Sequence, residues 1–339
     1  MRSHYPARME ARAHEDGAVP AAGESVPASV CWGRVGFLGP EGTFSEEAFL
    51  SEPGLAAGAL VPFPSIGEAL AAADRGEVDA AFVPIENSIE GTVSAALDHL
   101  VFDSDLLIQA ESVLDVHLHL LAPPGTRIED VTRVVSFPHA SAQCRRFVRE
   151  VLGGAEVVAS NSTAEAARIV GEDRPDGTAA LAPMLAGRLY GLEAIAEQIE
   201  DYSGNQTRFL LVAHDRVPAP TGHDRTSIVC FQRADHPGSL HEILGQFAAR
   251  NLNLTKIESR PTKQSLGDYC FVIDLEGHVA DEVVGDCLKE LHVSVAGLKF
   301  LGSYAAAGAH ASRVRQELSV RRREAEAWLA AVRKMATPD

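Results

Sequence analysis

The order in which strands and helices alternate along this 339-residue chain limits its fold more than any other feature. From Arg34 onward, short apolar runs are separated by segments with helical spacing. Two sets of strands are predicted, at 34–39, 60–63 and 78–83, and then at 131–137, 155–159 and 178–181. Strands that alternate with helices are typical of βαβ units in a mainly parallel sheet. The extended run 106–121 lies between the two sets, so we expect two small α/β lobes with a cleft between them.

Two more strands, at 192–200 and 207–213, end this part of the chain, and we expect both to return to the first lobe. Turn-forming residues precede the apolar run 209–212. Thr207 and Arg208 therefore lie where a loop enters a strand, which is a common place for reactive side chains. Residues 214–224 contain two prolines and a glycine, and this composition predicts a linker.

The pattern changes after the linker. Strands are predicted at 225–233, 254–259, 269–275 and 298–304, with helices at 238–250 and 281–291. This strand-helix-strand-strand-helix-strand order is ferredoxin-like. We expect residues 305–339 to form a charged helical extension. Residues 1–33 lack a charged start followed by a hydrophobic stretch, so they predict a disordered leader and no secretory signal.

Composition excludes several classes of function. The net charge is −17 with no basic stripe, which argues against a nucleic acid partner. Five scattered cysteines without a Cys-x-x-Cys pair argue against a disulfide framework and a zinc site, and favour a reduced cytoplasm. No apolar run reaches the roughly 20 residues of a membrane helix. The first lysine is Lys256, so lysine chemistry is excluded in the first two thirds of the chain.

Three segments carry the spacing of a helix capping box, and they begin at Thr43, Ser65 and Ser162. Free backbone N–H groups at a helix start can bind a carboxylate. The alternative is simple capping, which contributes about 1 kcal/mol to stability. His117 and His119 share a face of an extended stretch, but no third metal ligand is near in sequence, so a core or surface role is favoured.

Five stretches together resemble the prephenate dehydratase family, in the family's order. They are Gly39-Pro40-Glu41-Gly42-Thr43-Phe44-Ser45, Pro84-Ile85-Glu86-Asn87-Ser88-Ile89-Glu90-Gly91-Thr92-Val93, Ser160-Asn161-Ser162-Thr163, Tyr190-Gly191-Leu192 and Asn205-Gln206-Thr207-Arg208-Phe209. The resemblance implies a catalytic domain at 34–213 with the bilobal type II periplasmic-binding-protein fold. Residues 225–304 are similar to an ACT domain, a ferredoxin-like βαββαβ amino-acid sensor. The stretch 137–144 departs modestly from the family pattern.

The activity that this resemblance implies is the cofactor-free and metal-free conversion of prephenate to phenylpyruvate in L-phenylalanine biosynthesis. Thr207 then matches the family's essential threonine, as a hydrogen-bond donor or proton conduit to the leaving oxygen. Substrate-binding residues are expected at the matching positions, which are Thr43, Phe44, Ser45, Asn87, Ser88, Asn161, Ser162, Thr163, Arg208 and Phe209. Arg208 offers bidentate geometry to a carboxylate, but neighbours on a strand point to opposite faces, so a structural role for it stays open.

The ACT resemblance implies regulation by L-phenylalanine between associated subunits, in a homodimer or homotetramer. The expected effector-binding residues are Pro237, Gly238, Ser239, Leu240, Glu258, Ser259 and Arg260. Pro237 to Ser239 begin a predicted helix whose amide groups can bind an amino acid carboxylate. The alternatives are an arogenate dehydratase, a dimerisation module without a ligand in the second domain, and an amino-acid-binding protein without chemistry.

Overall fold

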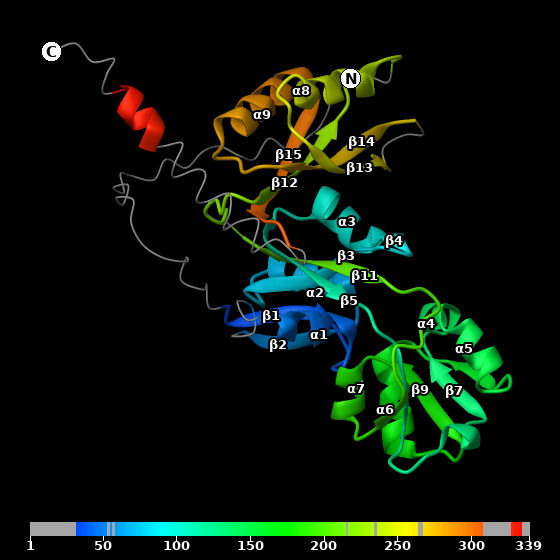
Figure 1. Ribbon diagram of the computed structural model, residues 1–339. Coiled ribbons are helices and arrows are strands. Elements are labelled where there is room, and N and C mark those ends of the chain that lie inside the picture. Colours follow the sequence, from blue (N-terminus) through cyan, green and yellow to red (C-terminus); the bar gives the residue numbers. More distant parts are fainter. Residues whose placement is uncertain are drawn as a thin grey trace.

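The computed structural model describes residues 32–52, 55, 58–214, 216–233, 236–263, 267–307 and 327–333. The predicted leader lies outside this part of the chain except for its last two residues, and so does most of the predicted C-terminal extension, of which residues 327–333 are helical. Within these described ranges, three sheets follow one another along the molecule (Figure 1). Among the described residues no helix is long and apolar enough to cross a membrane.

The first sheet has a mixed parallel and antiparallel order. Its strands in spatial order are β2 (Ala59–Phe63), β1 (Arg34–Leu38), β3 (Ala80–Asn87), β11 (Gln206–Ala213) and β5 (Leu107–Asp115), with β4 (Gly91–Thr92) beside β3. β1, β2 and β3 are parallel, whereas β11 runs antiparallel to both of its neighbours. The helices of this part are α1 (Phe44–Ser51), α2 (Ile66–Asp74), α3 (Ser94–Asp98) and the π-helix η1 (His99–Asp103).

The second sheet forms the other lobe. Its strands in spatial order are β10 (Glu193–Ala196), β6 (His119–Ala122), β9 (Thr178–Ala182), β7 (Arg133–Ser136) and β8 (Glu156–Ala159). Its helices are η2 (Ile128–Asp130), α4 (Pro138–Gln143), α5 (Arg145–Glu150), α6 (Thr163–Asp173) and α7 (Met184–Leu189). β9 is buried along its whole length, as the continuous apolar run of a central strand requires.

The chain crosses between the two lobes twice, and the two crossings lie side by side. Val116 N donates to Asn205 O at 2.8 Å, and Ile199 N donates to Leu118 O at 2.9 Å. The expectation that both closing strands return to the first lobe was wrong for the earlier one. β10 stays in the second lobe and pairs with β6, and only β11 returns. The return crossing lies between these two strands.

The segment between β7 and β8 forms two short helices, α4 and α5, which are separated at Cys144. Asp201, on the return crossing, binds the backbone groups on both sides of the break. Its N–H donates to Gln143 O, and its carboxylate accepts from Arg146 N at 3.1 Å. A contact between residues far apart in sequence satisfies these groups, so local periodicity could not predict the break.

The third sheet is antiparallel and has the ferredoxin-like order. Its strands in spatial order are β13 (Leu254–Pro261), β14 (Tyr269–Glu276), β12 (Asp224–Phe231) and β15 (Gly297–Ala305). The helices α8 (Ser239–Ala248) and α9 (Glu282–Ser294) cover the face turned away from the first sheet (Figure 1). β12 begins at Asp224, so the last residue of the predicted linker belongs to the strand.

One apolar core joins the first and third sheets. It contains Leu97, Leu210 and other residues of the first part together with Val229, Val272 and Leu301 of the third sheet. The backbones approach closely at Gly302, where a Cβ atom would lie 2.7 Å from Ile108 O. The third sheet is therefore packed against the first lobe and is not merely tethered to it.

Candidate active site

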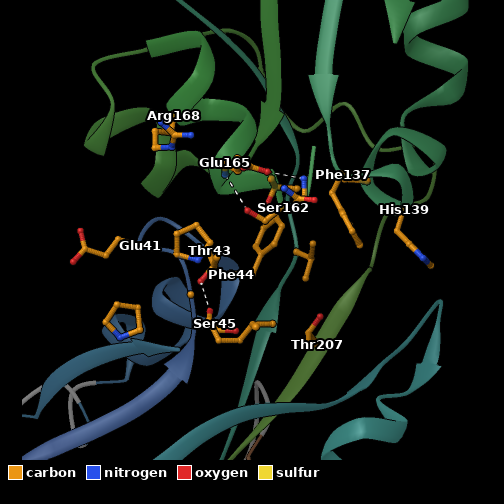
Figure 2. A pocket seen from close by; sticks show the side chains of 18 of the residues that line it. Glu41, Thr43, Phe44, Ser45, Phe137, His139, Ser162, Glu165, Arg168 and Thr207 are labelled. Carbon is orange, nitrogen blue, oxygen red and sulfur yellow. Dashed lines mark hydrogen bonds between the residues drawn. The ribbon is translucent and has the colours of Figure 1, made fainter. Parts of the chain in front are cut away.

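A cavity of about 850 Å³ lies between the two lobes, at the base of which the chain crosses from one to the other. Both lobes contribute to its wall (Figure 2). The residues that line it are Leu38, Gly39, Pro40, Glu41, Thr43, Phe44, Ser45, Pro62, Phe63, Pro64, Asn87, Val116, Leu118, Phe137, His139, Ala140, Gln143, Asn161, Ser162, Thr163, Glu165, Arg168, Tyr190, Asn205 and Thr207. Cavities of this size bind small molecules.

Thr207 lines the cavity from the start of β11, and Asn87 lies directly opposite it on β3. Asn87 Nδ2 donates to Thr207 Oγ1 at 2.9 Å and to Asn205 Oδ1 at 2.8 Å. Asn87 Oδ1 accepts from the backbone N–H groups of Ile89 and Glu90 at 2.9 and 3.0 Å. An amide group has two donor and two acceptor positions, so the orientation of this amide is determined and all its positions are occupied.

This saturation assigns a different function to Asn87 from the one predicted. It has no donor left for a substrate, so its contribution is to orient Thr207. A hydroxyl that accepts a hydrogen bond from Asn87 keeps its own proton for donation. Among the described residues, Thr207 Oγ1 has no other hydrogen-bond partner, which leaves that proton free for a molecule in the cavity.

Gln143 and Asn205 extend this network across the cleft. Asn205 Nδ2 donates to Gln143 Oε1 at 3.1 Å, and Gln143 belongs to α4 of the second lobe. Neither residue was predicted as part of the site. Gln143 lies in the stretch 137–144, and Asn205 lies in the stretch 205–209, both of which were compared with the family pattern in the sequence. Their positions in these stretches were the sequence signal that could have identified them. The hydroxyl of Thr207 is thus connected through amides to both lobes.

The two predicted helix starts face each other across the cavity (Figure 2). On α6, Ser162 Oγ accepts from Glu165 N at 2.9 Å, which confirms the predicted side-chain cap. The Glu165 carboxylate accepts from Asn161 N, one residue before the N-cap, at 2.7 Å. On α1 the predicted side-chain cap is wrong, because Thr43 Oγ1 donates to Leu38 O and does not accept from the first turn of the helix. The first N–H groups of both helices favour negative charge.

Ionisable side chains at the cavity are partly paired with the protein. Arg168 pairs with Glu172 at 2.6 Å, and His139 lies 3.3 Å from Glu90. The acidic residue Glu165 is held by the capping contact described above. Burial, followed by the nearby Glu41 carboxylate, raises the pKa of Tyr190, so its phenol is a neutral donor at neutral pH. Positive potential for an anion therefore comes from the helix starts together with Arg168.

Three predicted substrate-binding residues lie outside the cavity wall, and these predictions are corrected. Arg208 points to the opposite face of β11 and contacts Glu111, Asp274 and Tyr304. Phe209 is buried and stacks on Phe82 with ring centroids 5.3 Å apart. Ser88 Oγ accepts from Gln206 N at 2.9 Å and so closes the turn that leads to β11. The remaining predicted residues line the cavity.

The predicted effector residues divide into two groups. Pro237, Gly238, Ser239 and Leu240 lie at the start of α8, where Gly238 has a φ of 96° and Leu240 packs into the core. Ser259 is exposed on the edge strand β13.

The side chains of Glu258 and Arg260 instead point to the first lobe, which corrects their prediction as side-chain ligands. Glu258 accepts from Thr92 Oγ1, and Arg260 donates to Asp98 at 3.0 Å. Burial alone would raise the pKa of Asp98, but Arg260 and Lys263 outweigh it and hold that pKa below its usual range.

His117 of the crossing and His119 at the start of β6 have separate partners. His117 Nδ1 lies 2.9 Å from Glu200 Oε1, and His119 Nδ1 accepts from Gln198 N at 3.4 Å. No group of three or more His, Cys, Asp and Glu side chains within the described ranges is arranged to hold a metal ion.

Comparison with known proteins gives two family matches. The sequence profile of prephenate dehydratase matches residues 35–217, and that of the ACT domain matches residues 226–293. A prephenate dehydratase of Amycolatopsis methanolica is 41% identical over 307 residues, which cover 89% of this chain and 98% of that protein. One of Mycobacterium tuberculosis is also 41% identical, over 88% of this chain and 94% of that protein.

Solved structures agree with these matches. The prephenate dehydratase of Arthrobacter aurescens, solved in complex with L-Phe, has a TM-score of 0.72 and 39% identity over 89% of this chain and 99% of that chain. The enzyme of Staphylococcus aureus has a TM-score of 0.70 and 28% identity over 80% of this chain and 99% of that chain. GqqA, described as a novel type of quorum-quenching acylase, has a TM-score of 0.72 and 29% identity over 81% and 98%.

Proposed function

Because the chain belongs to the prephenate dehydratase family and carries an ACT domain, we propose that the interlobe cavity binds prephenate and that Thr207 is the catalytic group. The observation that supports this assignment is the contact between Asn87 and Thr207, which leaves the hydroxyl proton of Thr207 free toward the cavity. We propose residues 34–213 as the catalytic domain and residues 225–304, with Asp224 added, as the regulatory domain.

The reaction removes carbon dioxide and the ring hydroxyl of prephenate together. The electron pair of the broken carbon–carboxylate bond enters the ring, the carbon–oxygen bond breaks, and the departing hydroxide must gain a proton. Thr207 donates a hydrogen bond to this oxygen as negative charge develops on it. Aromatisation supplies the driving force, so orientation of the substrate is the main task of the protein.

The two carboxylates of prephenate are bound by the helix starts on either side of the cavity. The start of α1 (Thr43, Phe44 and Ser45) and the start of α6 (Asn161, Ser162 and Thr163) come from opposite lobes, so a dianion held between them also holds the lobes together. Arg168 adds positive charge at the wall. Such local groups are needed because the chain as a whole carries a net charge of −17.

The test of this assignment is Thr207→Ala, measured as phenylpyruvate formation from prephenate. We expect kcat to fall by about 10²-fold or more, since removal of one transition-state donor has this effect in other enzymes. Thr207→Ser keeps the hydroxyl and is expected to retain part of the activity. Near-normal kcat in Thr207→Ala would refute the assignment.

Two alternative activities are arogenate dehydration and the acylase activity named for the structural relative GqqA, and the substrate that the protein converts distinguishes them from prephenate dehydration. Arogenate differs from prephenate by an amino group, so comparison of kcat/KM on the two substrates decides the preference. An acylase would need a base next to its nucleophile. The partner of Thr207 Oγ1 in the described chain is the amide Nδ2 of Asn87, which is no base, and this argues against acyl hydrolysis here. Hydrolysis of an N-acyl homoserine lactone by the protein would contradict this view.

L-Phenylalanine is proposed as the effector of the ACT domain. The relative of Arthrobacter aurescens was solved with L-Phe, and in this chain the start of α8 and the exposed Ser259 on β13 are available to a ligand. Ser259→Trp should raise the L-phenylalanine concentration that gives half inhibition by about tenfold or more, and leave uninhibited kcat unchanged. Unchanged inhibition in this variant would refute the effector site.

We further propose a homodimer or homotetramer that works in the cytoplasm without cofactor or metal. β13 is an edge strand, and the exposed side chains of Ile257 and Tyr269 lie on or beside it, as expected for a strand that meets a partner. The four cysteines of the described chain are all unpaired and buried, which suits a reducing compartment. Light scattering of the purified protein measures the subunit number, and a monomer would refute the proposal.

A further inference from the structure

Arg208 follows Thr207 on β11, and its side chain points to the opposite face of the strand. There it is enclosed by the third sheet (β13, β14, β12 and β15), which belongs to the proposed regulatory domain and is called the regulatory sheet below. Only 12% of the side chain is exposed. Its Nη1 donates to Asp274 Oδ2 at 2.7 Å, its Nη2 donates to Tyr304 OH at 2.9 Å, and its Nε donates to Glu111 Oε2 at 2.8 Å. Two of these three partners belong to the third sheet.

The partners are also bonded to one another, through Ser227. Ser227 Oγ lies 2.6 Å from both Tyr304 OH and Asp274 Oδ1. Ser227 has one proton and donates it to Asp274, so it accepts from Tyr304, and Tyr304 in turn accepts from Arg208. Burial raises the pKa of Tyr304 far above its ordinary value, so the phenol keeps its proton. Arg208, Tyr304, Ser227 and Asp274 thus form a closed cycle of hydrogen bonds, which we name the Arg208 ring.

The three regulatory residues of the ring come from three different strands. Ser227 lies on β12, Asp274 on β14 and Tyr304 on β15. Tyr304 is fully buried, and Ser227 and Asp274 are nearly so. Glu111 of β5 accepts from Arg208 outside the ring and also binds Arg225 of β12. Buried polar networks in which every member is satisfied are rigid, so the ring holds the Arg208 side chain in one place.

The strand ladder next to Thr207 needs such a support. The pairing of β11 with β3 shifts register between Arg208 and Phe209, which oppose Glu86 and Pro84. Pro84 has no N–H to donate, and an irregularity leaves one residue unpaired. The ladder alone therefore holds Thr207 and Asn87 less firmly opposite each other than a regular ladder would.

Side chains of the regulatory sheet hold both strands at this place. Arg208, beside Thr207, is bound in the ring, and Glu86, beside Asn87, lies 3.1 Å from Lys256 Nζ of β13. Because side chains alternate along a strand, a residue held on one face fixes the direction of its neighbour on the other.

We propose that Ser227, Asp274 and Tyr304 of the regulatory sheet are positioning residues for the catalytic reaction, which act on Thr207 through Arg208. This inference rests on the proposed role of Thr207. The regulatory sheet then supports β3 and β11 on the face opposite to the cavity, in addition to its proposed function in effector binding.

The test uses the full chain, two ring variants, one control variant and one variant that assigns the Thr207 signal. Tyr304→Phe and Ser227→Ala each remove one hydroxyl from the ring. Thr226→Val is the matched control, because Thr226 is a buried neighbour on β12 whose hydroxyl binds Gly277 O and Ser303 outside the ring. Two readouts are needed, kcat and KM on prephenate and the threonine methyl spectrum of protein with ¹³C-labelled threonine methyl groups. Thr207→Ser, which lacks the methyl group, identifies the signal of Thr207.

In Tyr304→Phe and Ser227→Ala, we expect the Thr207 methyl signal to shift or broaden as the side chain samples further rotamers. We expect kcat to fall about tenfold with KM within about twofold, the pattern for an interaction made only in the transition state. Thr226→Val should lower stability similarly and change neither readout.

An unchanged Thr207 methyl signal in both ring variants would overturn the proposal, even if kcat fell, since the fall would then come from general destabilisation. A changed signal in Thr226→Val would overturn it too. If the unmodified protein does not turn over prephenate, the function of Thr207 is refuted, and the methyl signal still decides whether the ring positions this side chain.

Discussion

At the scale of residues, the site depends on which proton each polar group can give. Asn87 uses every position of its amide, and Thr207 consequently accepts from Asn87 and can donate to the cavity. The neighbouring side chain, Arg208, leaves the same strand in the opposite direction and serves the interface with the regulatory sheet. A single strand therefore presents a chemical group to one face and a structural group to the other.

Asn87→Asp tests the direction of the hydrogen bond. A carboxylate cannot donate, so Thr207 would donate to Asp at this position and lose its proton for the substrate. We expect kcat to fall about 10²-fold at neutral pH, and to recover partly as the pH falls toward the ordinary carboxyl pKa of about 4. Asn253→Asp, which adds the same charge at an exposed position of the regulatory domain, is the control. Equal activity of Asn87→Asp and its control would contradict the assigned direction.

His119 gives a pH dependence of stability. Burial lowers the pKa of His119 and outweighs the opposite effects of Glu197 and Glu200. As the pH decreases below about 6.5, the pKa of an unfolded histidine, His119 binds a proton in the unfolded chain before it does so in the folded protein. The free energy of unfolding therefore decreases as the pH is lowered through this range. His119→Gln should reduce the loss of melting temperature between pH 7.5 and pH 5.5, and exposed His241→Gln should not. The same loss in His119→Gln and the unmodified protein would show that other groups dominate.

At the scale of elements, helix starts have two separable functions. Ser65 and Ser162 both accept the hydrogen bond of a helix cap, at 3.2 and 2.9 Å. Only the helix that begins after Ser162 faces the cavity. The same local motif therefore stabilises both helices and lines the cavity in one of them, because the surrounding lobes decide where each helix points.

Ser162→Ala and Ser65→Ala form a matched pair. Each should lower the free energy of unfolding by about 1 kcal/mol, which is the usual effect of losing a cap. Only Ser162→Ala should also raise KM for prephenate, by about threefold to tenfold, because the cavity loses a hydroxyl and an ordered helix start. Urea unfolding and steady-state kinetics measure the two effects. A KM increase of the same size in Ser65→Ala would mean that the change follows stability and not the site.

At the scale of the whole molecule, the catalytic and regulatory parts share one core and several polar contacts. Residues of the first and third sheets belong to the same apolar cluster. Lys299 of β15 also donates to the carbonyls of Val101 and Ser104, and Arg260 of β13 binds Asp98 of α3. A rearrangement of the regulatory sheet must therefore move contacts that reach the catalytic strands.

Gly302→Ala probes this shared interface. The glycine has a φ of 144°, and a Cβ atom there would lie 2.7 and 2.9 Å from the backbone of Ile108, so the two sheets must separate slightly. We expect urea unfolding of the unmodified protein to show one cooperative transition. In Gly302→Ala the free energy of unfolding should be lower by about 1–3 kcal/mol. Gly245→Ala, within α8 where a Cβ atom meets nothing within 4 Å, should stabilise by about 0.5–1 kcal/mol. Two separate transitions in the unmodified protein would contradict a shared core.

Local patterns in the amino-acid sequence were enough to predict the order of the elements, the ferredoxin-like change after the linker, the cap at Ser162 and the position of Thr207 at the start of a strand. These features depend on neighbours in the chain, so periodicity and turn chemistry encode them. Tertiary structure alone decided that Asn87 is saturated, that Cys144 interrupts a helix, and that Arg208 binds Asp274 rather than a substrate. Those outcomes depend on groups separated by about 60 to 120 residues, and no local pattern records which distant groups the folded chain brings together.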